Sequence, residues 1–132
     1  MLARAFRVLL VLWAGSLWSA AIWVTPTLFR AQPDRALAGL LAGRLFTIEA
    51  YLGLATAALA LLLPVRAKFL WGYVAAALLA IMQWVLRPAM AVAHARGAAW
   101  GLTFGAWHGV AALLYGGAGV AALLVIWNDD FR

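Results

Sequence analysis

The chain has 132 residues, of which 68% are apolar and only 11% are charged. Soluble domains are about 45–50% apolar and about 25% charged, so this composition excludes an ordinary soluble fold and predicts a protein embedded in a lipid bilayer. The net charge of +6 comes from basic residues scattered at the ends of apolar runs, which argues against a nucleic-acid partner, and the absence of cysteine excludes disulfides and thiolate metal sites.

The first apolar run extends from about residue 6 to residue 25 and ends at Pro26. Its start, with Arg4 and Arg7 before an apolar stretch, imitates a secretory signal peptide. The apolar run nevertheless continues through Val24, beyond the small residues that would mark a cleavage site. We therefore expect an uncleaved first membrane helix.

The second apolar run ends at Pro64 and reaches back to at least Leu45. Pro33 followed by Asp34 predicts a helix that begins with Asp34 as its N-cap. From Asp34 to Pro64 such a helix is about 46 Å long, whereas a bilayer core is about 30 Å thick. Part of it is expected to protrude, to tilt or to lie at the interface.

The third run extends from about Phe69 past Leu86, and the fourth from about Ala98 to Trp127. The segments "PVRAK" and "ARGA" predict tight turns between neighbouring antiparallel helices, and Gly97 is a natural C-terminal cap for the third helix. No convincing internal repeat is present in the sequence.

Backbone groups in lipid must bond within their own segment, so the four runs are predicted to be helices. The expected fold is all-α: a single domain over residues 1–132, forming an antiparallel four-helix transmembrane bundle whose second helix extends beyond the bilayer core. Arg4, Arg7 and the basic turn at residues 66–68 place both termini in the cytoplasm by the positive-inside rule. The amino-acid usage favours a bacterial inner membrane.

Glycines recur at four-residue spacing near the start of the fourth run, at Gly101, Gly105 and Gly109. Such stripes let helix backbones approach closely in lipid. Packing within one chain is the commoner reason for this pattern. A contact face in a homo-oligomer, or a groove for a substrate, is the alternative.

Ionisable residues inside membrane helices are costly, so each is a candidate functional residue. Counting outward from the two tight turns places Glu49, Arg87 and His108 at similar depth, with Gln83 beside them. An Arg87–Glu49 ion pair is the first expectation, with His108 as a hydrogen-bond partner or proton acceptor. Three more residues lie nearer the edge or rim of this layer. The predicted ligand-binding set is Glu49, Gln83, Arg87, His108, Arg44, His94 and Arg30.

Three interpretations of this polar layer stay open. The first is a non-enzymatic membrane protein that binds an amphipathic anionic molecule, such as a lipid, a quinone or a tetrapyrrole, through bidentate arginine contacts. The second is a redox protein that carries haem b on His108. His94 would lie about 10 Å from His108 in depth, so ligation of one iron by both is not expected. The third is a structural or assembly factor without a ligand.

The stretches "LWAGSLWSAAIWVTPTLF", "AGLLAGRLFTIEAY" and "FGAWHGVAALL" carry a resemblance to a known family. Their order and spacing resemble the W-G, P-x-L-F, A-G-x-L-F and F-x-x-x-H-G pattern of the transmembrane-protein-205-like family, described as domain of unknown function 4149. This resemblance implies a small four-helix membrane protein without an established activity. "WSAAIWVTPTLF" more weakly resembles HemJ-type protoporphyrinogen oxidases, which implies the redox alternative of haem-linked or tetrapyrrole chemistry.

Overall fold

The computed structural model of the chain describes residues 1–65 and 69–128. Four helical spans in these ranges are long and apolar enough to cross a membrane, which confirms the predicted all-α bundle. Two of the spans contain a short π-helical stretch. The elements are α1 (Leu2–Ser19), η1 (Ala20–Val24), α2 (Thr25–Ala31), α3 (Arg35–Leu62), α4 (Leu70–Ile81), η3 (Met82–Leu86), α5 (Arg87–Arg96) and α6 (Phe104–Trp127).

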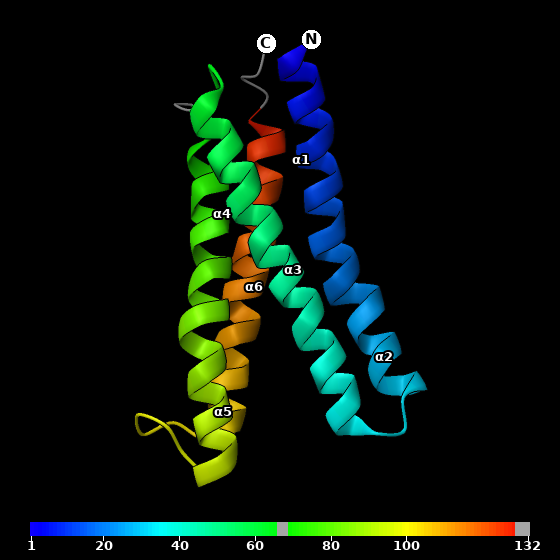
Figure 1. Cartoon of the computed structure of the whole chain (residues 1–132), viewed down its shortest axis with the longest axis vertical. Helices are drawn as coiled ribbons and strands as arrows, with labels where there is room; N and C mark the ends of the chain where they lie inside the picture. Colours follow the sequence, from blue (N-terminus) through cyan, green and yellow to red (C-terminus); the bar gives the residue numbers. More distant parts are fainter. Residues whose placement is uncertain (66–68, 129–132) are drawn as a thin grey trace.

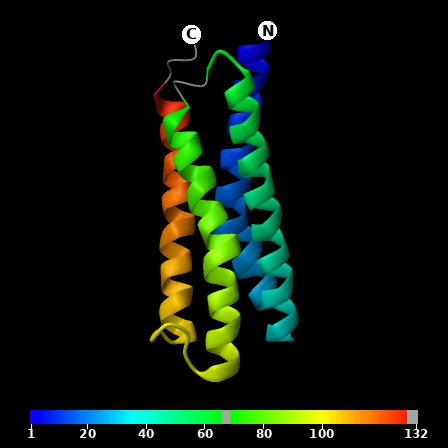
Figure 2. The same ribbon diagram turned by 60° about the vertical axis from the view of Figure 1, so that its left-hand side comes forward.

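The helices pack as two antiparallel hairpins, with α1 against α3 and α6, and α4 against the same two helices (Figures 1 and 2). The N-terminus and the end of α6 lie at one end of the bundle. Toward the other end the hairpins diverge, so that α2 packs on α3 while α5 packs on α6 (Figure 1). We call this the divergent half.

The main hydrophobic core lies in the half of the bundle that holds the N-terminus. Leu10 and Leu17 of α1, Leu79 of α4 and Phe69 just before α4 are its largest fully buried side chains. A smaller cluster around Trp107 packs α5 against α6 in the divergent half. Apolar packing therefore joins the two hairpins mainly at one end.

The first helix of each hairpin passes through a proline by widening into a π-turn. η1 precedes Pro26 and η3 precedes Pro88, and each turn is closed by an N–H to C=O bond that spans five residues. Proline lacks an N–H and its ring would clash with the carbonyl four residues earlier, so a regular α-turn cannot continue there. The first span consequently continues to Ala31, and the predicted end at Pro26 was wrong.

Two predicted helix caps are confirmed. Asp34 Oδ1 accepts hydrogen bonds from the N–H groups of Ala36 (2.9 Å) and Leu37 (3.2 Å), so α3 begins where expected. α5 ends at Gly97, whose φ of 86° is a conformation that glycine adopts without strain. α3 has 28 residues, or about 42 Å of helix, which exceeds the thickness of a bilayer core.

The fourth helix begins at Phe104, not near Ala98 as predicted. Thr103 caps it, because Thr103 Oγ1 accepts a hydrogen bond from the Ala106 N–H at 3.3 Å. The connection from α5 therefore covers residues 97–103 and is not a tight "ARGA" turn. The other predicted turn, "PVRAK", falls mainly on residues 66–68, outside the described residues.

The α5–α6 connection closes on itself as a small loop. Ala99 and Leu102 exchange two backbone hydrogen bonds (2.9 and 3.0 Å) around Trp100 and Gly101, which both have positive φ. Trp107 Nε1 donates to the Ala99 carbonyl at 3.0 Å and ties the loop to α6. Gly101 thus belongs to this loop, and the predicted glycine stripe starts only at the next glycine.

The two hairpins repeat one pattern of burial, which the sequence did not reveal. When residues are counted back from Pro26 in the first helix and from Pro88 in the third, the same five positions are buried in both helices. These pairs are Leu10 and Gly72, Trp13 and Ala75, Ala14 and Ala76, Leu17 and Leu79, and Ala20 and Met82. The first helices of the two hairpins therefore resemble each other in their π-turns and in the residues that they bury before the proline.

Two glycines of α3 allow the packing to be tested. A Cβ on Gly53 would approach Trp13 Cζ2 to 3.0 Å and Leu79 Cδ1 to 3.2 Å, whereas no atom lies within 4 Å of a Cβ on Gly39. We predict that Gly53→Leu lowers the free energy of unfolding by about 1–3 kcal/mol through overpacking. Gly39→Leu should leave it unchanged or slightly raised, since glycine is a poor helix former. Thermal unfolding in detergent, followed by circular dichroism, gives the comparison, and equal effects of both variants would contradict the packing.

Candidate functional site

Polar side chains gather where η3 meets α5, at the level from which the hairpins diverge. They come from three helical spans and form two separate groups. The first group joins η3 and α5 to α3. The second joins α3 to α1. The first group consists of the side chains of Thr47, Gln83 and Arg87 and the backbone carbonyl of Gly43. The second group consists of Ser16 and Glu49.

Arg87 reaches from the start of α5 to the backbone of α3. Its Nη1 atom lies 2.6 Å from Thr47 Oγ1, 3.2 Å from the Gly43 carbonyl oxygen and 3.3 Å from Gln83 Oε1. Gln83 Nε2 donates to Thr47 Oγ1 at 3.0 Å, and Thr47 Oγ1 donates to the Gly43 carbonyl at 2.9 Å. All three oxygens that accept hydrogen bonds from Arg87 are uncharged.

Gly43 makes room for this guanidinium. A Cβ at this position would lie 2.8 Å from Arg87 Nη2, closer than real Cβ contacts come, and 3.3 Å from Arg87 Cζ. The guanidinium therefore rests against bare α3 backbone. Any larger residue at position 43 would push the Arg87 side chain away from Thr47.

Glu49 belongs to the second group and does not meet Arg87. Its side chain is 5% exposed, and Ser16 Oγ of α1 donates to its Oε2 at 3.1 Å. Thr47 and Glu49 are two residues apart on α3, or about 200° around the helix axis, so they face opposite sides. Among the described residues no carboxylate pairs with Arg87, and the expected Arg87–Glu49 ion pair is absent.

His108 does not enter the polar layer. It is exposed on α6, with its ring stacked on Phe104 at a centroid distance of 6.2 Å. The longer α5–α6 connection explains the difference, because antiparallel helices that end at Arg96 and begin at Phe104 bring Arg87 level with Leu113. His108 consequently lies about 7 Å nearer the connection than the tight turn predicted.

His94 and His108 are both exposed near the α5–α6 connection, and both pack on the ring of Phe104. The centroid of the His94 ring lies 5.3 Å from that of Phe104. One residue further into the bundle is tied to α1, since the Tyr115 hydroxyl donates to the Leu17 carbonyl at 2.9 Å.

The remaining predicted site residues stay outside the layer. Arg30 and Arg44 are exposed on α2 and α3, and neither takes part in its hydrogen bonds. No group of three His, Asp or Glu side chains that could hold a metal ion occurs in residues 1–65 and 69–128. The structure thus unites Arg87 and Gln83, keeps Glu49 on another side, and leaves four predicted residues apart from both groups: Arg30, Arg44, His94 and His108.

Sequence reasoning missed Thr47, which accepts hydrogen bonds from both Arg87 and Gln83. The sequence did indicate that Thr47 is near Arg87, since counting from the α3–α4 turn places residue 47 at the depth of residues 86 and 87. Threonine in a membrane helix usually bonds its own backbone, and for that reason it attracts less attention than a charged residue.

Comparison with known proteins gives a match to a family model. The family model described as Domain of unknown function (DUF4149) matches residues 8–99, a range that includes Gly43, Thr47, Gln83 and Arg87 but ends before α6. No curated protein and no solved structure matches the chain. The likeness to transmembrane-protein-205-like proteins and the weaker likeness to HemJ-type oxidases stay predictions.

Thr47 offers a test of the Arg87 group. We predict that Thr47→Val lowers the free energy of unfolding by about 1–3 kcal/mol, because two donors lose their acceptor in a low-dielectric interior, while Thr47→Ser restores it. Thr56→Val is the matched control. Thr56 is also buried on α3, but its hydroxyl bonds only the Leu52 carbonyl of its own helix at 2.8 Å, so a change of at most about 1 kcal/mol is expected. Denaturant titration in mixed micelles measures both, and a Thr56→Val loss as large as that of Thr47→Val would count against an inter-helix role.

Proposed function

As this chain belongs to the DUF4149 family, whose function its description leaves open, we propose a function from geometry. The protein is a small, non-enzymatic integral membrane protein that binds an anionic amphipathic molecule. The carboxylate or phosphate head lies on Arg87, and the apolar part lies between the diverging hairpins.

The uncompensated charge of Arg87 carries this proposal. A guanidinium inside a membrane protein is costly unless an anion or several oxygens stabilise it. The hydrogen bonds that Arg87 makes to other described residues all start from its Nη1 atom and end on uncharged oxygens. The Nε and Nη2 groups make no such bond. Guanidinium binds carboxylate and phosphate through two parallel hydrogen bonds, and an acidic head group would supply the missing negative charge.

The divergent half supports the proposal at one position of α3. Gly39 lies seven residues before Phe46, whose ring packs on Tyr115 inside the bundle at 4.9 Å. No atom lies within 4 Å of a Cβ placed on Gly39. An apolar chain can therefore approach the α3 backbone below Arg87.

Arg87 variants test the proposal directly. The full chain, purified in a neutral detergent, is titrated with oleate, with oleoyl lysophosphatidic acid and with uncharged monoolein, and adducts are counted by native mass spectrometry. We predict that the two acidic probes bind and that Arg87→Ala weakens them about tenfold or more, the value of a lost charge-assisted hydrogen bond. Arg87→Lys keeps the positive charge but lacks the two parallel N–H donors of a guanidinium, so it should give an intermediate affinity.

Arg96→Ala is the matched control, since Arg96 is an exposed arginine at the end of the same helix. Its affinity for the acidic probes should stay within about twofold of the unmodified chain. Equal binding of monoolein, or unchanged affinity in Arg87→Ala, would rule the proposal out. Preference for one acidic probe over the other distinguishes carboxylate from phosphate recognition.

A further inference from the structure

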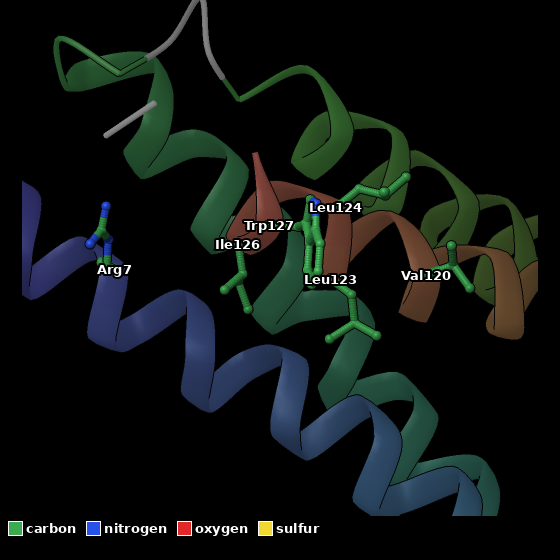
Figure 3. A pocket seen from close by; sticks show the side chains of 6 residues that line it. All are labelled: Arg7, Val120, Leu123, Leu124, Ile126 and Trp127. Carbon is green, nitrogen blue, oxygen red and sulfur yellow. The ribbon is translucent and has the colours of Figure 1, made fainter. Parts of the chain in front are cut away.

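An open groove of about 730 Å³ lies between α1 and the last turns of α6, at the end of the bundle that holds the N-terminus (Figure 3). It is separate from the Arg87 group, which lies between α3 and α5. One basic side chain comes from α1, and the rest of the lining comes from α6. The lining residues are Arg7, Val120, Leu123, Leu124, Ile126 and Trp127.

The floor of the groove is apolar and faces the surroundings of the bundle. Val120 is 49% exposed and Leu123 is 46% exposed. Gly116 continues this face one turn further along α6, and no atom lies within 4 Å of a Cβ placed there. In a bilayer, an apolar groove on the outside of the bundle is filled by hydrocarbon, because water finds no hydrogen-bond partners in it. From Trp127 to Gly116 the helix offers about 16 Å, enough for much of an acyl chain.

Charge and aromatic character select the head group. Arg7 lies on the α1 wall of the groove, and Arg4 lies one turn earlier on the same helix. Trp127, with its side chain 83% exposed, lies at the same end, in the position where tryptophans anchor membrane helices at the interface. Arginine binds phosphate by paired charge-assisted hydrogen bonds.

We propose that this groove binds one anionic phospholipid, with an acyl chain along Val120 and Leu123 and the phosphate at Arg7. The site is distinct from that of the Arg87 ligand and does not depend on it. Zwitterionic phospholipids fill the same apolar groove but gain less from the basic residues of α1, since attraction to anionic lipid adds about 1 kcal/mol for each nearby basic residue.

The absence of cysteine from the chain permits a clean experiment. A single Leu123→Cys variant is labelled with bimane and placed in phosphatidylcholine nanodiscs that contain doxyl-labelled phosphatidylglycerol or doxyl-labelled phosphatidylcholine. Leu113→Cys is the matched control, since Leu113 is a 77% exposed leucine of α6 outside the groove. At equal mole fraction, doxyl-phosphatidylglycerol should quench the label at position 123 roughly fivefold more strongly, and both lipids should quench the label at position 113 equally.

Substitutions of Arg7 in the labelled Leu123→Cys chain complete the test. Arg7→Gln should remove the preference for phosphatidylglycerol, and Arg7→Lys should keep it, while substitution of the exposed Arg96 at the end of α5, Arg96→Gln, should have no effect. Equal quenching by the two lipids at position 123 would overturn the proposal. A preference that survives Arg7→Gln, or one that is equally strong at position 113, would show general enrichment of anionic lipid around the protein and would also overturn it.

Discussion

The structure depends on one constraint: two prolines lie inside helices that are long and apolar enough to cross a membrane, where backbone groups must bond within the protein. Each is accommodated by a π-turn that restores hydrogen bonding around the missing N–H, so the helix continues instead of ending. Both π-turns lie at the level where the hairpins begin to separate. Arg87 stands directly before Pro88, and the turn that admits the proline also sets the position of the arginine against α3.

Comparison of the two hairpins shows which polar residues are present in only one of them. In the first hairpin Thr25 stands directly before Pro26, in the place that Arg87 takes before Pro88. Counted from the N-caps Asp34 and Thr103, Thr47, the partner of Arg87, corresponds in α6 to Gly116. Both hairpins have the π-turn and the pattern of buried residues before it, but Arg87 and its hydrogen-bond acceptors occur in one position only. The candidate functional residues are therefore those that the two hairpins do not share.

Sequence reasoning predicted the helix number, the Asp34 and Gly97 caps, and the depth of Arg87 relative to the second helix, because these follow from composition, capping chemistry and one short turn. It could not predict which side each polar residue faces. Thr47 and Glu49 are at nearly the same depth, yet the 100° step of a helix turns them to different neighbours. His108 was misplaced because residues 97–103 form a loop, and a few added residues move a whole helix along its axis.

The separation of Glu49 from Arg87 bears on what this protein can bind. A buried Arg87–Glu49 ion pair would neutralise both charges, and an anionic ligand would then have to displace a carboxylate before binding. Instead Glu49 is enclosed on the α1 side with Ser16, while Arg87 rests on uncharged oxygens on the side of α3 that faces α5. This arrangement leaves the positive charge of Arg87 without a carboxylate partner among the described residues.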